Sequence, residues 1–428
     1  MIFSVYYLAA LVLAAGDFCG RLARWRVVAP VWGAAPWCSV LFVSYAGQLA
    51  IVYAAAQHSP WPIALVPAVP ERGDLVTASL LALGAVQVFA LAGLYRARIG
   101  AAVVATGAAM LALSWFAPVF LNADIYAYVG NGLLGIGAYA PPNAPFSGDF
   151  SVINARWETP VPAATYGPLW LTIARLVVTI TPSLAGKLLA FRALGLISFV
   201  ALVALLRACG LPGRILALAA LNPGLLLQFV VDAHNDMLPI VLVVAAAAIV
   251  RRLPYAACAL VVVAALVKLP YAITGLPVLA ALYPATRRYA ACAAVVAAAM
   301  LLSWLGGGAG YARALLGYAS STGLLSVLHF GAALAAVAAI LAAVAGARRL
   351  RGAVWLMPML GAYTASWYAI WSLPYALGRR NVLVYLLVWF PLVSVLAEPS
   401  LARPWTMVFV IPALVAVSLR YSLQPRPS

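Results

Sequence analysis

The chain has 428 residues, of which 66% are hydrophobic and only 8% are charged, with a mean hydropathy of +1.05. A soluble domain of this size cannot bury so many apolar side chains, because its surface stays large relative to its volume. Long apolar runs recur along the whole length instead, and each of them predicts a membrane helix. We therefore expect an all-α, polytopic integral membrane protein.

The net charge of +17 does not indicate a nucleic-acid partner. Nearly all the cations are arginines that fall in short clusters between apolar spans, as in the cytoplasmic loops of membrane proteins. Nucleic-acid binding would require a basic face with interleaved aromatic residues, which the sequence lacks. The five cysteines include no CxxC pair, so we expect them to be buried apolar side chains.

The apolar segments predict the membrane helices in chain order, and some are short enough to be half-spans, so we expect about 11 to 13 helices. Residues 2–16 are interpreted as a short first span and not as a cleaved signal. The segments are 2–16, 33–56, 75–95, 99–121, 167–206, 215–232, 237–250, 254–283, 289–305, 327–347, 353–374, 381–397 and 405–423. The basic clusters, expected inside, are Arg21/Arg24/Arg26, Arg96/Arg98, Arg207/Arg214, Arg251/Arg252, Arg287/Arg288 and Arg348/Arg349/Arg351.

A polar and aromatic segment, 122–166, interrupts the apolar pattern. It holds Asp124, Asp149 and Glu158, three of the nine carboxylates in the chain. A long segment without strong periodicity is usually functional or disordered, and its aromatic, proline and glycine content argues against disorder. Because the preceding basic cluster is expected inside, the segment is predicted to be an external catalytic loop, with Arg156 as its single cation.

Asp124 begins this segment and is the first candidate for chemistry. Tyr126, Tyr128 and Tyr139 follow it, and tyrosine side chains suit stacking and hydrogen bonding with a sugar, although they also populate interfacial belts. Nearby glycines would let a ligand approach the backbone closely. The alternative is that Asp124 only caps a helix or faces water at the membrane interface.

The segment 167–206 lies between an external loop and an internal basic cluster, so it must cross the membrane an odd number of times. We expect a short helix that dips into the membrane and returns near Pro182, followed by one full span from about Lys187 to Leu206. A re-entrant segment of this kind is tolerated where it lines a cavity within the protein.

The segment 254–283 has both ends inside but is too short for two full spans. It breaks at Lys268-Leu269-Pro270, so two half-length helices would place Lys268 at the tip of a hairpin near the outer interface. A lysine within an apolar run is a functional candidate, and its ammonium group suits a phosphate. The alternative is a lysine that snorkels to the membrane surface.

Asp232, His234, Asn235 and Asp236 cluster where one apolar run ends and the next begins, expected at the outer face. A plain polar turn seldom needs two carboxylates and a histidine, so we expect substrate contacts here. Metal ligation by His234 with an aspartate is not diagnostic without a Cys/His framework. We therefore predict no cofactor and leave metal dependence open.

Other cations occupy unusual places. Arg192 follows the expected re-entrant helix, and Arg379 and Arg380 fall outside by the span count, against the general trend. Either they bind an anionic lipid phosphate or the count is wrong by one span. No nucleophile elbow, nucleotide-phosphate loop or dinucleotide fingerprint occurs, so acyl transfer, nucleotide hydrolysis and dinucleotide redox chemistry have no visible machinery.

Several short motifs follow one another in an order that, together with their spacing, resembles the GT-C superfamily of membrane glycosyltransferases. The likeness is closest to the polyprenyl-phosphate-mannose-dependent mannosyltransferases of bacterial envelopes. Ala138 departs from this pattern, because the subfamily often has proline there. The motifs are Asp124-Ile125-Tyr126-Ala127-Tyr128, Gly137-Ala138-Tyr139, Thr165-Tyr166-Gly167-Pro168-Leu169, His234-Asn235-Asp236, Lys268-Leu269-Pro270 and Trp367-Tyr368-Ala369-Ile370-Trp371-Ser372-Leu373-Pro374.

The resemblance implies an inverting transferase that moves a sugar, expected to be mannose, from a polyprenyl-phosphate donor to a hydroxyl of an envelope glycolipid or glycan. The site would face the periplasm or exterior from the plasma membrane of a bacterium, and no nucleic acid would take part. Asp124 would be the general base, so no second carboxylate is required. Lys268, Arg192, Arg379 and Arg380 would hold the donor phosphate. Substrate contacts are expected from Tyr126, Tyr128, Tyr139, Glu158, Tyr166, His234, Asn235, Asp236, Trp367 and Tyr368.

We expect a single transmembrane domain over 1–428, with a module over about 99–305 and C-terminal helices over 327–423. Two other functions remain open from the residues alone. Intramembrane cations and broken helices also suit a transporter or lipid flippase, although the external segment and the lack of an inverted repeat do not. A polysaccharide polymerase or ligase would share the outer segment but matches the motifs less well.

Overall fold

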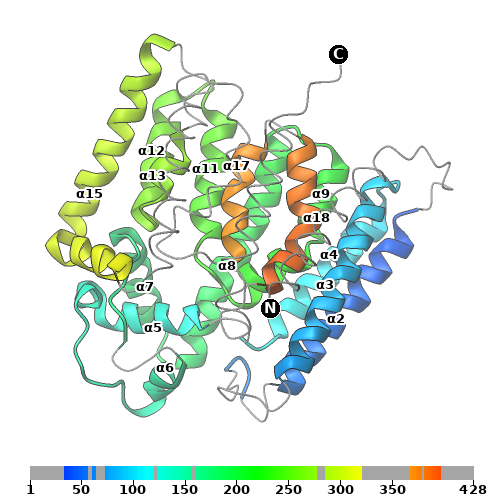
Figure 1. Ribbon diagram of the computed structural model, residues 1–428, viewed down its shortest axis with the longest axis horizontal. Helices are drawn as coiled ribbons and strands as arrows, with labels where there is room; N and C mark the ends of the chain where they lie inside the picture. Colours follow the sequence, from blue (N-terminus) through cyan, green and yellow to red (C-terminus); the bar gives the residue numbers. More distant parts are fainter. Residues whose placement is uncertain are drawn as a thin grey trace, which may run out of the picture.

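The computed structural model describes residues 33–55, 60–63, 73–119, 123–156, 161–276, 285–320, 366–377 and 380–396. These residues are almost entirely helical (Figure 1), and no strand occurs among them beyond an isolated bridge between Gly33 and Arg98. The all-α prediction is therefore confirmed. The spans expected at 2–16, 327–347 and 405–423 lie outside the described residues.

The described helices include four that are long and apolar enough to cross a membrane, or five if a bent pair counts as one span. They are Ala35–Ala54, Ser79–Arg96, Leu184–Ala208 and Ala290–Gly317, and the bent pair is Gly213–Ala220 with Pro223–Val231. Shorter apolar helices accompany them. These features confirm a multi-pass membrane protein.

The elements of the bundle in chain order are α2 (Ala35–Ala55), α3 (Gly73–Arg96), α4 (Ala101–Phe116), α7 (Pro168–Ile180), α8 (Leu184–Ala208), α9 (Gly213–Ala220), α10 (Pro223–Leu226), the π-helical η3 (Leu227–Val231), α11 (Met237–Ile249), α12 (Pro254–Val267), α13 (Tyr271–Thr274), α15 (Ala285–Ser320), the 3₁₀ helix η5 (Ser366–Ser372), α17 (Leu373–Ala376) and α18 (Arg380–Leu396). Helix α2 packs against α3 and α4, and α18 packs against α3. Helix α11 packs between α8 and α12. In Figure 1, α2 to α4 form one side of the bundle and α15 forms the other.

The segment predicted as an external loop contains short helices over 124–139 and 148–156. It contains α5 (Asp124–Leu134), η1 (Gly135–Tyr139), η2 (Gly148–Phe150) and α6 (Ser151–Arg156), which lie together at one end of the molecule (Figure 1). Every residue of α5 from Asp124 to Gly132 is buried. A helix buried in this way need not follow the apolar stripe of a surface helix, so its burial is hard to predict from the sequence.

The predicted break near Pro182 is confirmed, because α7 ends at Ile180 and α8 begins at Leu184. The Ser183 hydroxyl caps α8 by accepting a hydrogen bond from the Gly186 N–H, at 3.1 Å. Lys187, one of the two lysines in the chain, donates to carbonyls at the end of α7, including that of Val178 at 2.8 Å. Hydrogen bonds from the start of α8 to the end of α7 therefore stabilise the break between the two helices.

The predicted break at Lys268-Leu269-Pro270 is also confirmed, because these residues separate α12 from α13. Tyr166-Gly167 is joined to this break: the Gly167 N–H donates to the Val267 carbonyl at 2.9 Å. A Cβ on Gly167 would lie 2.1 Å from the Leu266 carbonyl oxygen, so only glycine permits this approach. Pro168 then opens α7 at a position where its missing N–H costs nothing.

Candidate active site

The site lies where α5, the Asp232–Asp236 turn, the end of α12 and η5 meet. The turn follows η3 and precedes α11, and its backbone is unusual because Ala233 has a φ of 54°. A non-glycine residue in this left-handed region costs about 1 kcal/mol. Such strain persists only where surrounding contacts fix the chain. The turn therefore has a fixed shape.

Asp124 and His234 form a buried pair. Asp124 Oδ2 lies 3.1 Å from His234 Nδ1, although the two residues are 110 positions apart in the chain. Both residues are almost fully buried. A carboxylate that shares a proton with an imidazole is held in one orientation and can exchange that proton, which is the arrangement used in general base catalysis. The structure therefore brings the two polar motifs predicted to be functional into direct contact.

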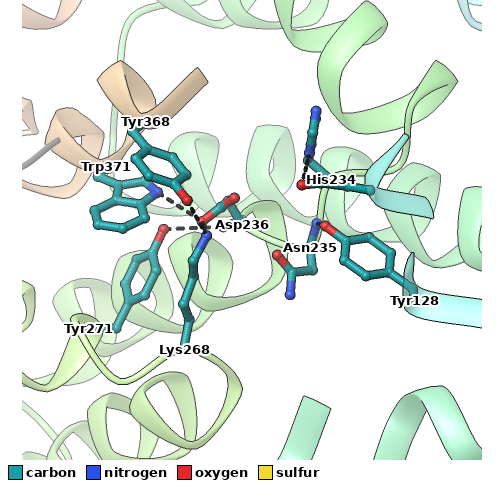
Figure 2. Close-up of polar contacts among 9 residues, drawn as sticks. Tyr128, His234, Asn235, Asp236, Lys268, Tyr271, Tyr368 and Trp371 are labelled. Atoms are coloured by element: carbon teal, nitrogen blue, oxygen red, sulfur yellow. Dashed lines mark hydrogen bonds and ion pairs between the residues drawn. The ribbon is translucent and has the colours of Figure 1, made fainter. Parts of the chain in front are cut away.

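Lys268 and Asp236 form a second buried pair, shown in Figure 2. Lys268 Nζ donates to Asp236 Oδ1 at 2.8 Å and to the Tyr368 hydroxyl at 3.1 Å, while Trp371 Nε1 donates to the same carboxylate oxygen at 2.9 Å. The Tyr271 hydroxyl donates to the Asp236 carbonyl at 3.4 Å. The ammonium group is thus neutralised, and the described residues account for two of its three donors.

Aromatic rings enclose the Lys268 ammonium. Its nitrogen lies 4.3 Å from the ring centroid of Tyr368, 5.1 Å from that of Trp371 and 5.9 Å from that of Tyr166. These distances are in the range of cation–π attraction. The Lys268 residue keeps 8% of its surface exposed, so one side of this aromatic cage remains accessible.

Asn235 lies between the two pairs. Its backbone N–H donates to the Tyr128 hydroxyl at 3.2 Å, and the residue is only 3% exposed. Neither amide atom of its side chain has a hydrogen-bond partner among the described residues. Buried polar groups nearly always have partners, so an unmatched amide beside two charged pairs indicates a place for a ligand. Figure 2 shows this amide below the turn, between Tyr128 and Asp236.

The predicted tyrosines serve mainly to brace the site. The Tyr128 ring meets the rings of Tyr166, Trp170 and Phe191 with centroid distances of 4.9 to 5.7 Å. The Tyr139 hydroxyl donates to the Tyr166 carbonyl at 3.1 Å, and burial raises the pKa of this hydroxyl. These contacts hold Tyr166 beside Lys268. Aromatic pairs of this kind add about 0.5 to 1.5 kcal/mol each beyond their buried area.

Arg156 is a site residue that the sequence analysis did not select. It ends α6, and its guanidinium carbon lies 5.8 Å from the ring centroid of Tyr126. Its Nε and Nη2 atoms are buried and have no partner among the described residues. Burial lowers the pKa of Arg156, while Tyr126 and Asp232 raise it. The signal was present in the sequence, because Arg156 is the single cation of the segment 122–166.

Arg192 lies near the site, but its guanidinium group already donates hydrogen bonds to backbone carbonyls. Its guanidinium is fully buried and donates to the carbonyls of Trp115, Ala117 and Val231 at 2.8, 2.6 and 3.0 Å. These bonds connect the end of α4 to the end of η3. The geometry therefore favours a positioning role over contact with a phosphate.

Arg380 lies elsewhere. It lines a pocket with Arg98 and Arg214, which are expected inside, and this supports the alternative that the span count is wrong by one span before Arg380. Glu158 and Arg379 lie outside the described residues, as does the side chain of Trp367.

Among the described residues, no group of three or more His, Cys, Asp or Glu side chains is placed to hold a metal ion. Asp149, a second-rank candidate in the segment 122–166, is exposed and takes no part in the described site. The polar groups at the site thus include two charged pairs, the buried Asp232 carboxylate, the unmatched amide of Asn235 and the half-buried guanidinium of Arg156.

The fold and the site define a multi-pass, all-α membrane protein with a buried polar site at one end of its helix bundle. Residues 30–286 match the model of the family described as alpha-(1->6)-mannopyranosyltransferase, N-terminal domain. The match covers more than half of the chain, so the protein belongs to this family of mannosyltransferases, and the resemblance drawn from the motifs is confirmed. No curated protein and no solved structure matches the chain significantly.

Proposed function

We propose that the protein transfers mannose from a polyprenyl-phosphate donor to a hydroxyl of an envelope glycolipid or glycan, with inversion at the anomeric carbon. The reaction would take place at the outer face of a bacterial plasma membrane, within one transmembrane domain. The observation that carries the proposal is the contact between Asp124 and His234 in a buried site that also holds Lys268 and Asn235. Family membership supports the sugar.

In this mechanism Asp124 accepts the proton of the acceptor hydroxyl as its oxygen bonds to C1 of mannose. The bond from C1 to the phosphate oxygen breaks at the same time, and its electron pair leaves with the polyprenyl phosphate. A general base typically contributes about 10² to 10⁴ in rate. His234, at 3.1 Å, holds the carboxylate in orientation and stabilises the proton after transfer.

The leaving phosphate needs positive charge in a site with little water. The third N–H of Lys268 and the unmatched N–H groups of Arg156 are the donors that the described residues offer. Fixed donors at a developing charge are worth about 10² to 10³ in rate each. The Asn235 amide would bind sugar hydroxyls between this cation and the base.

The test is transfer by purified protein in lipid nanodiscs, supplied with polyprenyl-phosphate mannose and a glycolipid acceptor extract, with product configuration read by NMR. Asp124→Asn should lower kcat by about 100-fold or more, because the amide cannot take the proton. Asp149→Asn is the matched control, since Asp149 is an exposed carboxylate of the same segment, and it should leave transfer unchanged.

Three results would contradict the proposal in different ways. If the protein transfers mannose from a nucleotide-linked donor and does not use the lipid-linked donor, the proposed donor is wrong but the enzyme is still a mannosyltransferase. If Asp124→Asn transfers mannose at an unchanged rate, Asp124 is not the general base, although the proposed donor is unaffected by this result. A product that retains the donor's anomeric configuration would exclude the single-step mechanism.

A further inference from the structure

A second polar feature lies at the end of the bundle away from the candidate active site. Arg98, Arg214 and Arg380 line one pocket of about 580 Å³, which we call the basic pocket. Helix α4 begins beside this pocket at Ala101 and ends at Phe116, whose neighbour Ala117 is bound by Arg192 of the site region. Sixteen residues of helix span about 24 Å, so the two features are well separated.

The three arginines come from three distant parts of the chain. Arg98 lies between α3 and α4, where its backbone pairs with Gly33. Arg214 lies in the first turn of α9, and Arg380 is the first residue of α18. The described residues that line the pocket include no carboxylate. Three like charges in one pocket repel one another unless an anion neutralises them.

Backbone dipoles add to this charge. Helices α4, α9 and α18 all begin at or near the pocket, and a helix start carries about half a positive charge with unpaired N–H groups. The residues that precede α4 and α9, Gly100 and Pro212, provide no side-chain cap. The pocket thus combines arginine side chains, which match phosphate oxygens in geometry, with uncapped helix starts.

The position of the pocket favours a lipid over a soluble ion. The candidate membrane spans Ser79–Arg96 and Leu184–Ala208 end close to it in sequence, which puts it at the level of lipid headgroups. Tyr95, Ile99 and Ile215 also line it and offer apolar surface for the glycerol and the first part of an acyl chain. An open pocket lined by exposed arginines and by apolar side chains suits a molecule with both characters.

We propose that the basic pocket binds the phosphate headgroup of an anionic membrane lipid from the leaflet at this end of the bundle. The three arginines bind the phosphate, and the apolar side chains bind the lipid's glycerol region. The site is independent of the catalytic function proposed above, because it shares no residue with the Asp124–His234 and Asp236–Lys268 pairs. A lipid bound here joins α3, α9 and α18 and stabilises the bundle.

The experiment uses the full-length protein in phosphatidylcholine nanodiscs with increasing phosphatidylglycerol. Native mass spectrometry counts retained lipids, and the Tm is measured in the same samples. The variant Arg214→Gln/Arg380→Gln should weaken phosphatidylglycerol binding by roughly 25-fold, since one arginine at an anionic surface is worth roughly fivefold. Arg252→Gln is the matched control, being an exposed arginine in the α11–α12 loop and not among the residues that line the pocket.

A second arm tests the source of the phosphate, with inorganic phosphate and glycerol phosphate added to protein in phosphatidylcholine nanodiscs. The proposal expects a Tm rise with phosphatidylglycerol and none with these soluble anions. An equal rise with soluble phosphate would show a soluble-anion site and overturn it. Equal loss of binding in Arg252→Gln would show unspecific attraction to the membrane surface, which would also overturn it. Neither result depends on whether mannose transfer is observed.

Discussion

Replacing Lys268 tests whether its pair with Asp236 is structural, catalytic or both. In Lys268→Met the Asp236 carboxylate, 1% exposed, keeps the Trp371 N–H as its only other side-chain donor among the described residues. Removing one partner of a buried ion pair costs about 3 to 5 kcal/mol, because the remaining charge is left without compensation. The methionine side chain is apolar and can pack within the aromatic cage. We therefore expect the free energy of unfolding to fall by an amount near the lower end of this range, about 3 kcal/mol.

The double variant Lys268→Met/Asp236→Asn separates the two roles. It removes both charges while an amide oxygen still accepts from Trp371, so we expect most of the stability to return, leaving a loss of about 1 kcal/mol. Unfolding by denaturant in mixed micelles, followed by tryptophan fluorescence, measures both values. The cycle also includes Asp236→Asn alone, which leaves the Lys268 ammonium without its carboxylate; its cost adds to a coupling energy that is at least about 2 kcal/mol.

Activity then decides whether Lys268 also serves the donor phosphate. We expect the double variant to fold but to transfer mannose at least 100-fold more slowly, since the phosphate loses a cation. A double variant with near-normal transfer would refute the phosphate role, and a single Lys268→Met variant as stable as the parent protein would refute the buried pair. The two outcomes are independent.

Three further changes have outcomes that the structure defines. Gly167→Ala should cost about 2 kcal/mol or more and lower the yield of folded protein, because the new Cβ would lie 2.1 Å from the Leu266 carbonyl oxygen; unfolding in mixed micelles measures this. Arg156→Gln should raise KM for the lipid-linked donor about tenfold with little change in Tm. The control is Arg313→Gln, at an exposed arginine of α15, which should change neither KM nor Tm. If KM in Arg156→Gln is no higher than in this control, Arg156 does not contact the phosphate. Asn235→Ala should leave stability within about 1 kcal/mol while kcat/KM falls about tenfold, since its amide has no described protein partner to lose; a large loss of stability would instead indicate a structural amide.

Much of the site could be predicted because its residues break local rules. Lys268 stands before a proline within an apolar run, and both features disfavour an uninterrupted membrane helix. Asp232 to Asp236 concentrate charge between two apolar segments, which is costly unless the groups find partners. The sequence therefore identified the positions, but the pairing of Asp124 with His234 and of Asp236 with Lys268 required the fold.

Other features could not be predicted because the usual signals were weak. Helix α5 contains Gly130-Asn131-Gly132, residues with low helix propensity, so the sequence favours a loop where the structure has a buried helix. The place of Arg380 could not be settled by counting spans, because the chain before it includes the 3₁₀ helix η5 and the short α17. A count of apolar spans assumes regular helices of full length, and one irregular crossing reverses every later assignment.

The motif residues also show why their order identified the family better than any one of them. Only some of them carry groups able to act on a substrate; the others hold those groups in place. Gly195 of α8 lets the Phe229 carbonyl of η3 approach to within 2.1 Å of where a Cβ would lie, and Arg192, one helical turn earlier, binds the Val231 carbonyl. Together they hold the end of η3, directly before Ala233, whose conformation is left-handed, and His234, which contacts Asp124. In the proposed mechanism, His234 held by these backbone contacts orients the Asp124 carboxylate before the acceptor arrives, and this would give the strain at Ala233 a part in catalysis.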